Sequence, residues 1–245
     1  VKDERVEVLD LESDVVVYHP ADHRLLLCDS LQKKDRFETF PAFSPDGRTL
    51  YFCSAEAKKI PEEYKEIRYN LCSIDFDPSA GTFGSRIDTL VNAEALGKSV
   101  SFPRPSYDSK YIMFTLSDYG NFSIWHKEAD LWLLDLTSGD LRKLSEVNSD
   151  DTESFHNWSS NSRWFVFSSR RGDGLYTRLY LASMDENGKI SKPFLLPQED
   201  PETYYDRSVY SYNVPDFTSE PIKIDTRVFE KKITSKERIQ VQAKK

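Results

Sequence analysis

Long apolar runs and glycine are scarce in this sequence. Apolar stretches such as residues 15–18 and 25–27 are the size of strands and fall far short of the ~18 residues that a membrane-spanning helix needs. We therefore expect no membrane span. Only 9 of the 245 residues are glycine and 12 are proline, which excludes collagen-like and low-complexity disordered chains.

Cysteine is also scarce. Cys28, Cys53 and Cys72 lack the C-x-x-C spacing of zinc or haem-attachment motifs. Each stands in an apolar or strand-like stretch, so we interpret them as buried free thiols. The sequence predicts no cofactor.

Acidic residues outnumber basic ones except at the C-terminus. The chain has 33 basic and 41 acidic residues, a formal net charge of −8. An acidic protein repels the phosphate backbone, so no nucleic-acid partner is expected. Residues 221–245 are different, with eight Lys or Arg against three acids. We therefore divide the chain into residues 1–220 and a basic C-terminal extension, residues 221–245.

One phrase occurs three times. The copies are residues 40–52, 102–114 and 155–167. Each holds a short strand, a Ser-x-Asp/Asn-Gly/Ser turn and a second strand rich in aromatic and β-branched residues. Aligned on their shared serines, the copies stand 62 and 53 residues apart. Because such turn side chains bond their own backbone, each copy predicts a β-hairpin. The hairpins are expected near residues 40–54, 102–116 and 155–169.

Further strands flank the hairpins. They are residues 14–18, 70–75 and 130–135, one upstream of each hairpin, and 177–182, which follow the last one. The resulting unit has a period near that of a four-stranded propeller blade. The sequence therefore predicts an all-β propeller with three clear repeats and flanking fragments. Short helical insertions are expected at residues 61–66 and 91–97, the second ending at Gly97.

The repeat resembles the WD-like repeat of TolB-type bacterial β-propellers. The residues that carry the resemblance are 43–52, Phe-Ser-Pro-Asp-Gly-Arg-Thr-Leu-Tyr-Phe, and 168–174 followed by Leu179-Tyr180-Leu181. It covers roughly residues 10–200, although the second and third copies lack the Pro-Asp-Gly core. The resemblance implies a ring of six or more blades when complete.

Three clear units are fewer than such a ring contains. Either some blades have diverged beyond recognition, or sequence upstream of Val1 completes the ring. The chain begins at Val1 with neither methionine nor a signal-like apolar segment. We therefore expect a processed or excised piece of a longer polypeptide, with further domains as possible neighbours.

The C-terminal extension is open to three interpretations. Apolar residues alternate with polar ones at Ile222 and Ile224 and again over residues 239–243, which is typical of strands. One interpretation is a strand that closes the ring against residues 6–8. Another is a linker to a further domain, starting at Phe229. Contact of the basic charge with acidic lipid is the weakest of the three, because acids alternate with the basic residues.

The segment at residues 117–130 is the main candidate site. It is longer than the connection that the repeat needs, and it combines aromatic and charged side chains, as binding surfaces do. Its candidate residues are Trp125, His126, Lys127 and Glu128. In the alternative interpretation, Phe122 and Trp125 pack between blades while His126 and Glu128 are solvated at the edge.

Four other candidate residues lie in or beside the predicted hairpins, at positions where their side chains are expected to approach one face of the propeller. They are Arg104, His156, Arg170 and Asp173. The spacing of the histidines does not support a metal site. No G-x-S-x-G nucleophile elbow occurs, and we assign no catalytic residue. The hypothesis of a catalytic pair of carboxylates, as in glycosidases, stays open, since the two residues need not be close in sequence.

These patterns favour a non-catalytic binding platform whose loops and axial mouth engage a protein or a cell-envelope component. The alternative is a carbohydrate-active enzyme or carbohydrate-binding propeller with its site at the central channel. A third hypothesis is a spacer between other domains. TolB-type propellers work in the bacterial cell envelope, so the resemblance implies a periplasmic or envelope-associated location.

Overall fold

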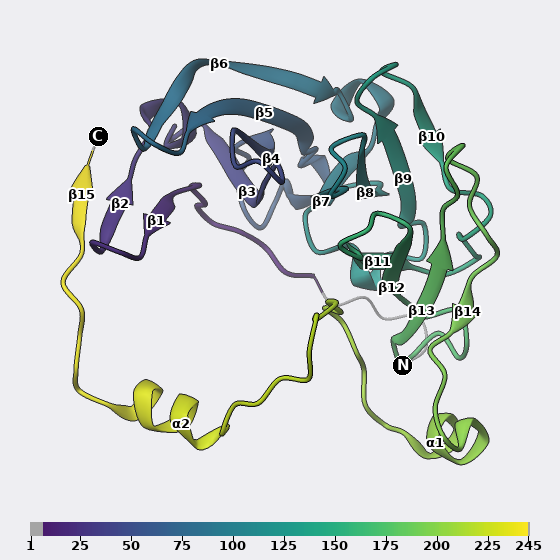
Figure 1. Cartoon of the computed structure of the whole chain (residues 1–245). Helices are drawn as coiled ribbons and strands as arrows, with labels where there is room; N and C mark the ends of the chain where they lie inside the picture. Colours follow the sequence, from purple (N-terminus) through teal and green to yellow (C-terminus); the bar gives the residue numbers. More distant parts are fainter. Residues whose placement is uncertain (1–6, 245) are drawn as a thin grey trace.

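The computed structural model describes residues 7–244. It contains three four-stranded antiparallel sheets and one three-stranded sheet, which stand side by side in an arc (Figure 1). The predicted all-β fold of four-stranded, propeller-type blades is confirmed. No helix within residues 7–244 has the length and apolar character to cross a bilayer.

Each four-stranded sheet is a meander whose strands pair in chain order. Blade 1 consists of β3 (Arg36–Phe43), β4 (Thr49–Glu56), β5 (Asn70–Asp77) and β6 (Thr82–Val91). Blade 2 consists of β7 (Ser99–Pro105), β8 (Tyr111–Ser117), β9 (Asp130–Asp135) and β10 (Leu141–Lys143). Blade 3 consists of β11 (Glu153–Trp158), β12 (Trp164–Ser169), β13 (Arg178–Ser183) and β14 (Phe194–Leu195).

The three predicted hairpins are the first two strands of each blade, but the predicted order within the unit was wrong. Residues 70–75, expected as the strand upstream of the second hairpin, lie in β5 and pair with β4. Residues 130–135 likewise form β9, which pairs with β8 of the hairpin before it. A blade therefore begins with its hairpin and continues outward.

The hairpin turns repeat the same hydrogen bonds. In blade 1, Ser44 Oγ donates to Asp46 Oδ1 at 2.6 Å, and Asp46 Oδ1 accepts from the Arg48 amide at 3.0 Å. The Thr49 amide donates to Ser44 Oγ at 2.9 Å. The equivalent side chains are Ser106 and Asp108 in blade 2 and Ser159 and Asn161 in blade 3. These side chains satisfy backbone N–H groups that the turn leaves unpaired.

Phenylalanines at one register position link the inner strands of the blades. Phe40, Phe102 and Phe155 all have positive φ, at 51°, 54° and 45°, and each lies where the pairing register shifts. Such a bulge re-aims the side chain. The ring centroids of Phe40 and Phe102 are 4.2 Å apart, and those of Phe102 and Phe155 are 4.3 Å apart. The repeat thus places a continuous row of aromatic rings across three blades.

The hydrophobic core is divided between neighbouring sheets. One cluster joins blades 1 and 2, through residues such as Phe37 and Phe114, and a second joins blades 2 and 3. The third packs Val15 and Leu31 against blade 1. As predicted, the cysteines are free thiols, and Cys53 and Cys72 are buried while Cys28 is partly buried.

The fourth sheet joins residues 17–26 to the C-terminal end of the described chain. It consists of β1 (Val17–His19), β2 (Arg24–Leu26) and β15 (Gln242–Lys244). β15 pairs in parallel with β2, not with the predicted partner at residues 6–8, of which Val6 lies outside the described residues. The alternating residues Ile222 and Ile224 form no strand, and Phe229 lies in a helix, α2 (Arg227–Thr234).

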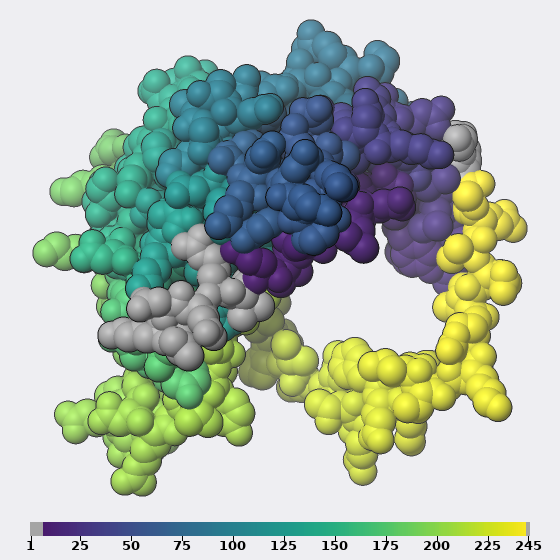
Figure 2. Space-filling model, turned by 180° about the vertical axis from the view of Figure 1, so that it is seen from behind, coloured from purple at the N-terminus to yellow at the C-terminus, as the bar shows by residue number. Residues whose placement is uncertain are grey.

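The C-terminal segment, residues 208–244, runs along the open side of the arc. It follows α1 (Pro201–Arg207) and continues past α2 to β15 at β2 (Figure 1). Figure 2 shows an opening between this segment and the N-terminal sheets. Arg178 holds its start by donating to the carbonyls of Ser208 at 2.8 Å and Tyr210 at 2.5 Å.

Short 3-10 helices interrupt the connections. They are η1 (Asp29–Leu31), η2 (Tyr64–Glu66), η3 (Glu94–Leu96) and η4 (Ser123–Trp125). Gly97 ends η3 with a left-handed φ of 65°, a conformation that glycine adopts without steric cost. The predicted helical insertions are therefore present as single turns.

Candidate functional site

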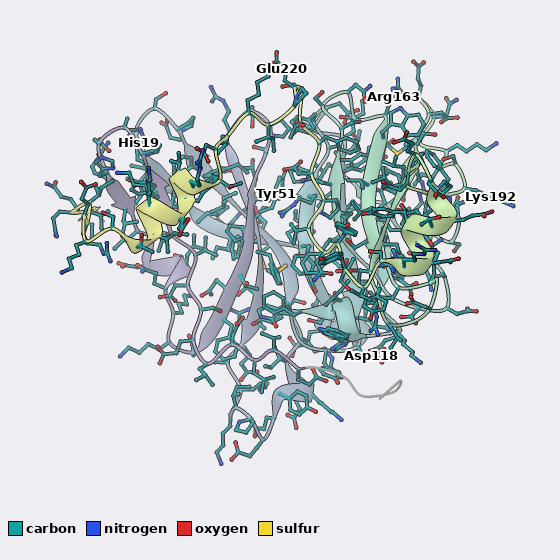
Figure 3. The ribbon with its side chains drawn as sticks, turned by 90° about the horizontal axis from the view of Figure 1, so that it is seen from below. His19, Tyr51, Asp118, Arg163, Lys192 and Glu220 are labelled. Atoms are coloured by element: carbon teal, nitrogen blue, oxygen red, sulfur yellow. The ribbon has the colours of Figure 1, made fainter. Side chains whose placement is uncertain are left out.

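The connections of the blades gather on two opposite faces. The tight turns at residues 44–48, 106–110 and 159–163 form one, the turn face. The longer connections at residues 57–69, 118–129 and 170–177 form the other, the loop face. Figure 3 shows Asp118 of the loop face and Arg163 of the turn face at opposite ends of the blades. The predicted segment 117–130 thus belongs to the loop face.

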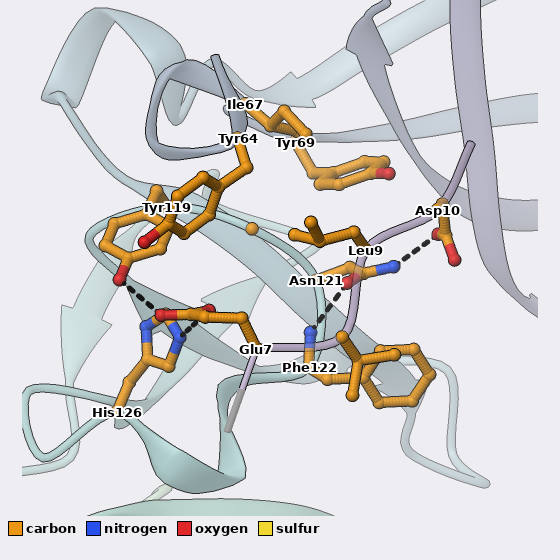
Figure 4. Close-up of a pocket in the computed structure, with 12 residues that line it drawn as sticks. Glu7, Leu9, Asp10, Tyr64, Ile67, Tyr69, Tyr119, Asn121, Phe122 and His126 are labelled. Carbon is orange, nitrogen blue, oxygen red and sulfur yellow. Dashed lines mark hydrogen bonds and ion pairs between the residues drawn. The ribbon is translucent and has the colours of Figure 1, made fainter. Parts of the chain in front are cut away.

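Residues 7–10, hereafter the N-terminal segment, lie in a cleft between blades 1 and 2 (Figure 4). The connection 57–69 lines one side with Tyr64, Ile67 and Tyr69, and the connection 118–129 lines the other with Tyr119, Asn121, Phe122 and His126. The space left in the cleft is about 10 Å³, which is room for about one water molecule. The segment therefore fills the cleft.

Side chains hold both ends of the N-terminal segment. Tyr119 Oη donates to Glu7 Oε1 at 2.7 Å, and His126 Nε2 lies 3.5 Å from Glu7 Oε2. At the other end, Asn121 Nδ2 donates to the Asp10 carboxylate. Asn121 Oδ1 accepts from the Phe122 amide at 2.9 Å, which orients the side-chain amide so that its nitrogen faces Asp10.

His126 is a buried bridge rather than a solvated side chain. It is only 2% exposed, so the alternative interpretation that places it in water at the edge is wrong. Its Nδ1 lies 3.3 Å from Glu128 Oε1, while its Nε2 faces Glu7. The Tyr119 ring packs against it with centroids 4.7 Å apart. His126 therefore connects its own loop to the N-terminal segment.

The carboxylate of Asp10 sits in poorly solvated surroundings. Burial raises its pKa, and the hydrogen bond from Asn121 offsets part of the rise. Burial and the nearby Asp10 charge also raise the pKa of Tyr69. The donors to the Glu7 and Asp10 carboxylates, Tyr119 and Asn121, are neutral, and such hydrogen bonds keep their strength where water is excluded.

The other predicted residues divide between the loop face and the blade interior. On the loop face, the Arg170 guanidinium stacks over the Trp125 ring at 4.7 Å, and Lys127 is exposed. Asp173 is also exposed there, and it accepts from the amides of Leu175 and Tyr176 at 2.8 Å.

Arg104 and His156 lie on the inner strands β7 and β11, away from the loops. His156 is buried, its Nε2 lies 2.9 Å from the Met113 carbonyl, and burial lowers its pKa to about 3. Burial also lowers the pKa of Arg104. The structure therefore does not bring these two residues to the candidate site.

Sequence reasoning missed Glu7, Asp10, Tyr69 and Tyr119 as site residues. Glu7 fell within a run interpreted as a strand partner, and Tyr119 lay in the candidate loop without being singled out. No periodicity or motif marks these positions, because their role depends on two loops meeting. Within residues 7–244, no group of three or more His, Cys, Asp or Glu side chains is placed to hold a metal ion.

No family model matches this chain, and no curated protein matches it. Solved structures with a similar arrangement include TolB from Acinetobacter baumannii, with 20% identity, a TM-score of 0.42 and coverage of 72% of this chain and 40% of that one. Another is the β-propeller domain of the trilobed protease from Pyrococcus furiosus, with 16% identity, a TM-score of 0.38 and coverage of 68% and 44%.

A third solved structure with a similar arrangement is an oligogalacturonate lyase in complex with manganese. It has 13% identity and a TM-score of 0.48, and the match covers 69% of this chain and 44% of the lyase. This chain therefore spans less than half the length of each of these three structures. The likeness concerns the fold.

Proposed function

We propose that this chain is a non-catalytic binding platform that engages a protein partner through its loop face. The observation that carries the proposal is that this face already holds a stretch of polypeptide. The N-terminal segment fills a cleft lined by connections of blades 1 and 2, and Tyr119 and Asn121 of the blade 2 connection are hydrogen-bonded to its carboxylates.

The cleft is rigid, as a recognition surface should be. Ser99 Oγ accepts from the Tyr69 amide at 3.0 Å and donates to the Gly120 carbonyl at 2.6 Å. The Gly120 amide donates to the Ile67 carbonyl at 3.1 Å. These bonds tie the connection of blade 1 directly to that of blade 2. Preorganised loops lose little entropy on binding, which favours affinity.

The loop face offers further contact area beside the cleft. The stacked pair of Trp125 and Arg170 combines two of the residue types that are enriched among energetic hot spots. Lys127 and Asp173 are exposed around it, which fits the polar rim of a protein interface. We propose that Trp125 is the central contact of this part of the surface.

The proposed setting is the bacterial cell envelope, with a protein or an envelope component as the partner. The support for it is the resemblance of residues 43–52 to the TolB-type repeat.

Affinity capture from an envelope extract of the source cells tests this function. We expect Trp125→Ala to weaken partner binding by about 2 kcal/mol or more if Trp125 is a hot spot, which is about 30-fold. Trp164→Ala is the matched control, because Trp164 is 41% exposed but lies next to a tight turn on the opposite face.

Equal retention by both variants and the unaltered chain would contradict a loop-face platform. Retention of a glycan instead, or glycan cleavage, would favour the carbohydrate-active alternative.

A further inference from the structure

We propose that the N-terminal segment is an internal ligand, and that its cleft is the binding site for an acidic, apolar peptide of the partner. The peptide would carry carboxylates at its first and fourth positions, with apolar residues between, as Glu7-Val8-Leu9-Asp10 does. The partner peptide binds by displacing the segment. This inference rests on the proposed function and names the chemistry of the partner.

The contacts in the cleft specify carboxylates at two separate points. Tyr119 and His126 face the Glu7 carboxylate. Asn121 donates to Asp10 and is only 4% exposed. The donors are neutral or aromatic groups at fixed positions, so they select for geometry as well as for charge. Leu9 lies between the two carboxylates and lines the cleft.

The N-terminal segment is held weakly enough to leave. Within residues 7–244, the backbone of residues 7–12 forms no hydrogen bond with the blades. The first such bond is at Ser13, whose carbonyl accepts from the Glu38 amide at 3.0 Å. Val8 is 45% exposed and Leu11 is 72% exposed. Segments with few buried contacts open locally without global unfolding, and Ser13 marks where opening would stop.

The cleft does not depend on the segment for its shape. The bonds of Ser99 to Tyr69 and Gly120, and of Gly120 to Ile67, lie beneath the segment and join the two loops. When the segment leaves, the buried Asn121 and His126 lose their carboxylate partners. Unpaired buried polar groups are unfavourable, so the open cleft is expected to take up another acidic peptide.

The test uses a fluorescently labelled peptide of residues 7–14 and the full chain carrying Glu7→Gln and Asp10→Asn. These changes keep the size of the segment but remove the charges that hold it. Because the competing segment is released, we expect the variant to bind the peptide at least about tenfold more tightly than the unaltered chain. Fluorescence anisotropy gives both dissociation constants.

Two controls show that binding occurs in the cleft. A peptide with Gln and Asn at the positions of Glu7 and Asp10 should bind at least about tenfold more weakly, because it loses both carboxylates. Adding Tyr119→Phe to the variant chain removes one hydroxyl donor and should also weaken binding. If circular dichroism shows that the double variant does not fold, Asp10→Asn alone takes its place.

Equal affinity of the unaltered chain and the folded variant, or no binding to either, overturns the inference. The N-terminal segment would then be a fixed part of the fold. This failure is distinct from failure of the proposed function, since capture of a partner through Trp125 is measured separately and does not require the cleft to open.

Discussion

Glu38 and Glu153 occupy the same position on the inner strands of blades 1 and 3, and each faces a serine directly across the hairpin. Glu38 pairs in register with Ser54 and Glu153 with Ser169. Ser54 Oγ donates to Glu38 Oε1 at 3.4 Å, and Ser169 Oγ donates to Glu153 Oε1 at 2.8 Å. Both glutamates are buried, so two of the three blades carry a buried acid at the same position.

The surroundings of the two carboxylates differ. Arg171 Nη2 lies 2.9 Å from Glu153 Oε1, and Ser149 Oγ adds a bond at 2.6 Å. Glu38 has a more distant cation, with Arg36 Nε 4.0 Å from its Oε1, and within residues 7–244 its Oε2 lacks a hydrogen-bond partner. Burial raises the pKa of both, that of Glu38 to about 7.

The raised pKa of Glu38 predicts a pH-dependent stability. Between its ordinary value of 4.5 and about 7, the folded state holds a proton that the unfolded state releases, so stability falls as pH rises through this window. Nearby Arg36 and Lys33 oppose the rise in pKa, and Asp14 adds to it.

We therefore expect Glu38→Gln to be more stable than the unaltered chain at pH 8, by on the order of 1 kcal/mol after allowance for solvent screening. The difference should nearly disappear at pH 4, below the ordinary value of 4.5, where Glu38 is protonated in the folded chain and mostly protonated in the unfolded chain. Urea unfolding at both pH values measures this. Glu153→Gln should show a smaller dependence on pH, because Arg171 offsets its burial. An equal gain at both pH values would show that Glu38 does not titrate in this range.

The hairpin turn of blade 1 predicts different effects for two substitutions of Asp46. Asp46→Ala removes the acceptor for Ser44 Oγ and for the Arg48 amide, so we expect the Tm to fall by about 2–4 °C. Asp46→Asn should change it little, because Asn161 makes the same bonds in blade 3. Differential scanning calorimetry compares the two. A similar fall in both would mean that the carboxylate charge matters more than the turn bonds.

Phe102 is expected to be a key contact between the blades. It is 5% exposed and lies between the rings of Phe40 and Phe155. Phe102→Ala should destabilise the chain by about 3–5 kcal/mol through loss of apolar contact and creation of a cavity. Tyr107→Ala, at a position 53% exposed, should stay within about 0.5 kcal/mol. Chemical denaturation of the two variants measures both changes in the free energy of unfolding.

Limited proteolysis should cut the C-terminal segment first. Residues 217–241 are mostly exposed, and α2 buries no residue. Residues 208–213 are held more firmly, since Ser168 Oγ donates to the carbonyls of Tyr212 and Asn213 at 2.8 and 2.9 Å. We expect trypsin to cut between Lys223 and Arg238 and to leave the blades folded, because exposed and weakly bonded backbone is cleaved first. Initial cleavage within a blade, seen by mass spectrometry, would contradict this.

The hairpins and the type of blade follow from local features of the sequence. The Ser-x-Asp turn depends on bonds within five residues, such as that from the Thr49 amide to Ser44 Oγ, and strand alternation is equally local. Three copies of one phrase therefore predicted three hairpins and an all-β repeat fold. The burial of Cys53 and Cys72 followed from their apolar neighbours in the strands.

Long-range contacts, by contrast, define which strands share a blade, where β15 pairs and which residues form the cleft. The pairing of β5 with β4 depends on which strand edge the chain reaches after the connection 57–69. Glu7 meets Tyr119 across more than a hundred residues of sequence, and the buried His126 faces the same carboxylate. Contacts between irregular loops leave no periodic trace in a sequence, since they depend on how rigid blades bring distant residues together.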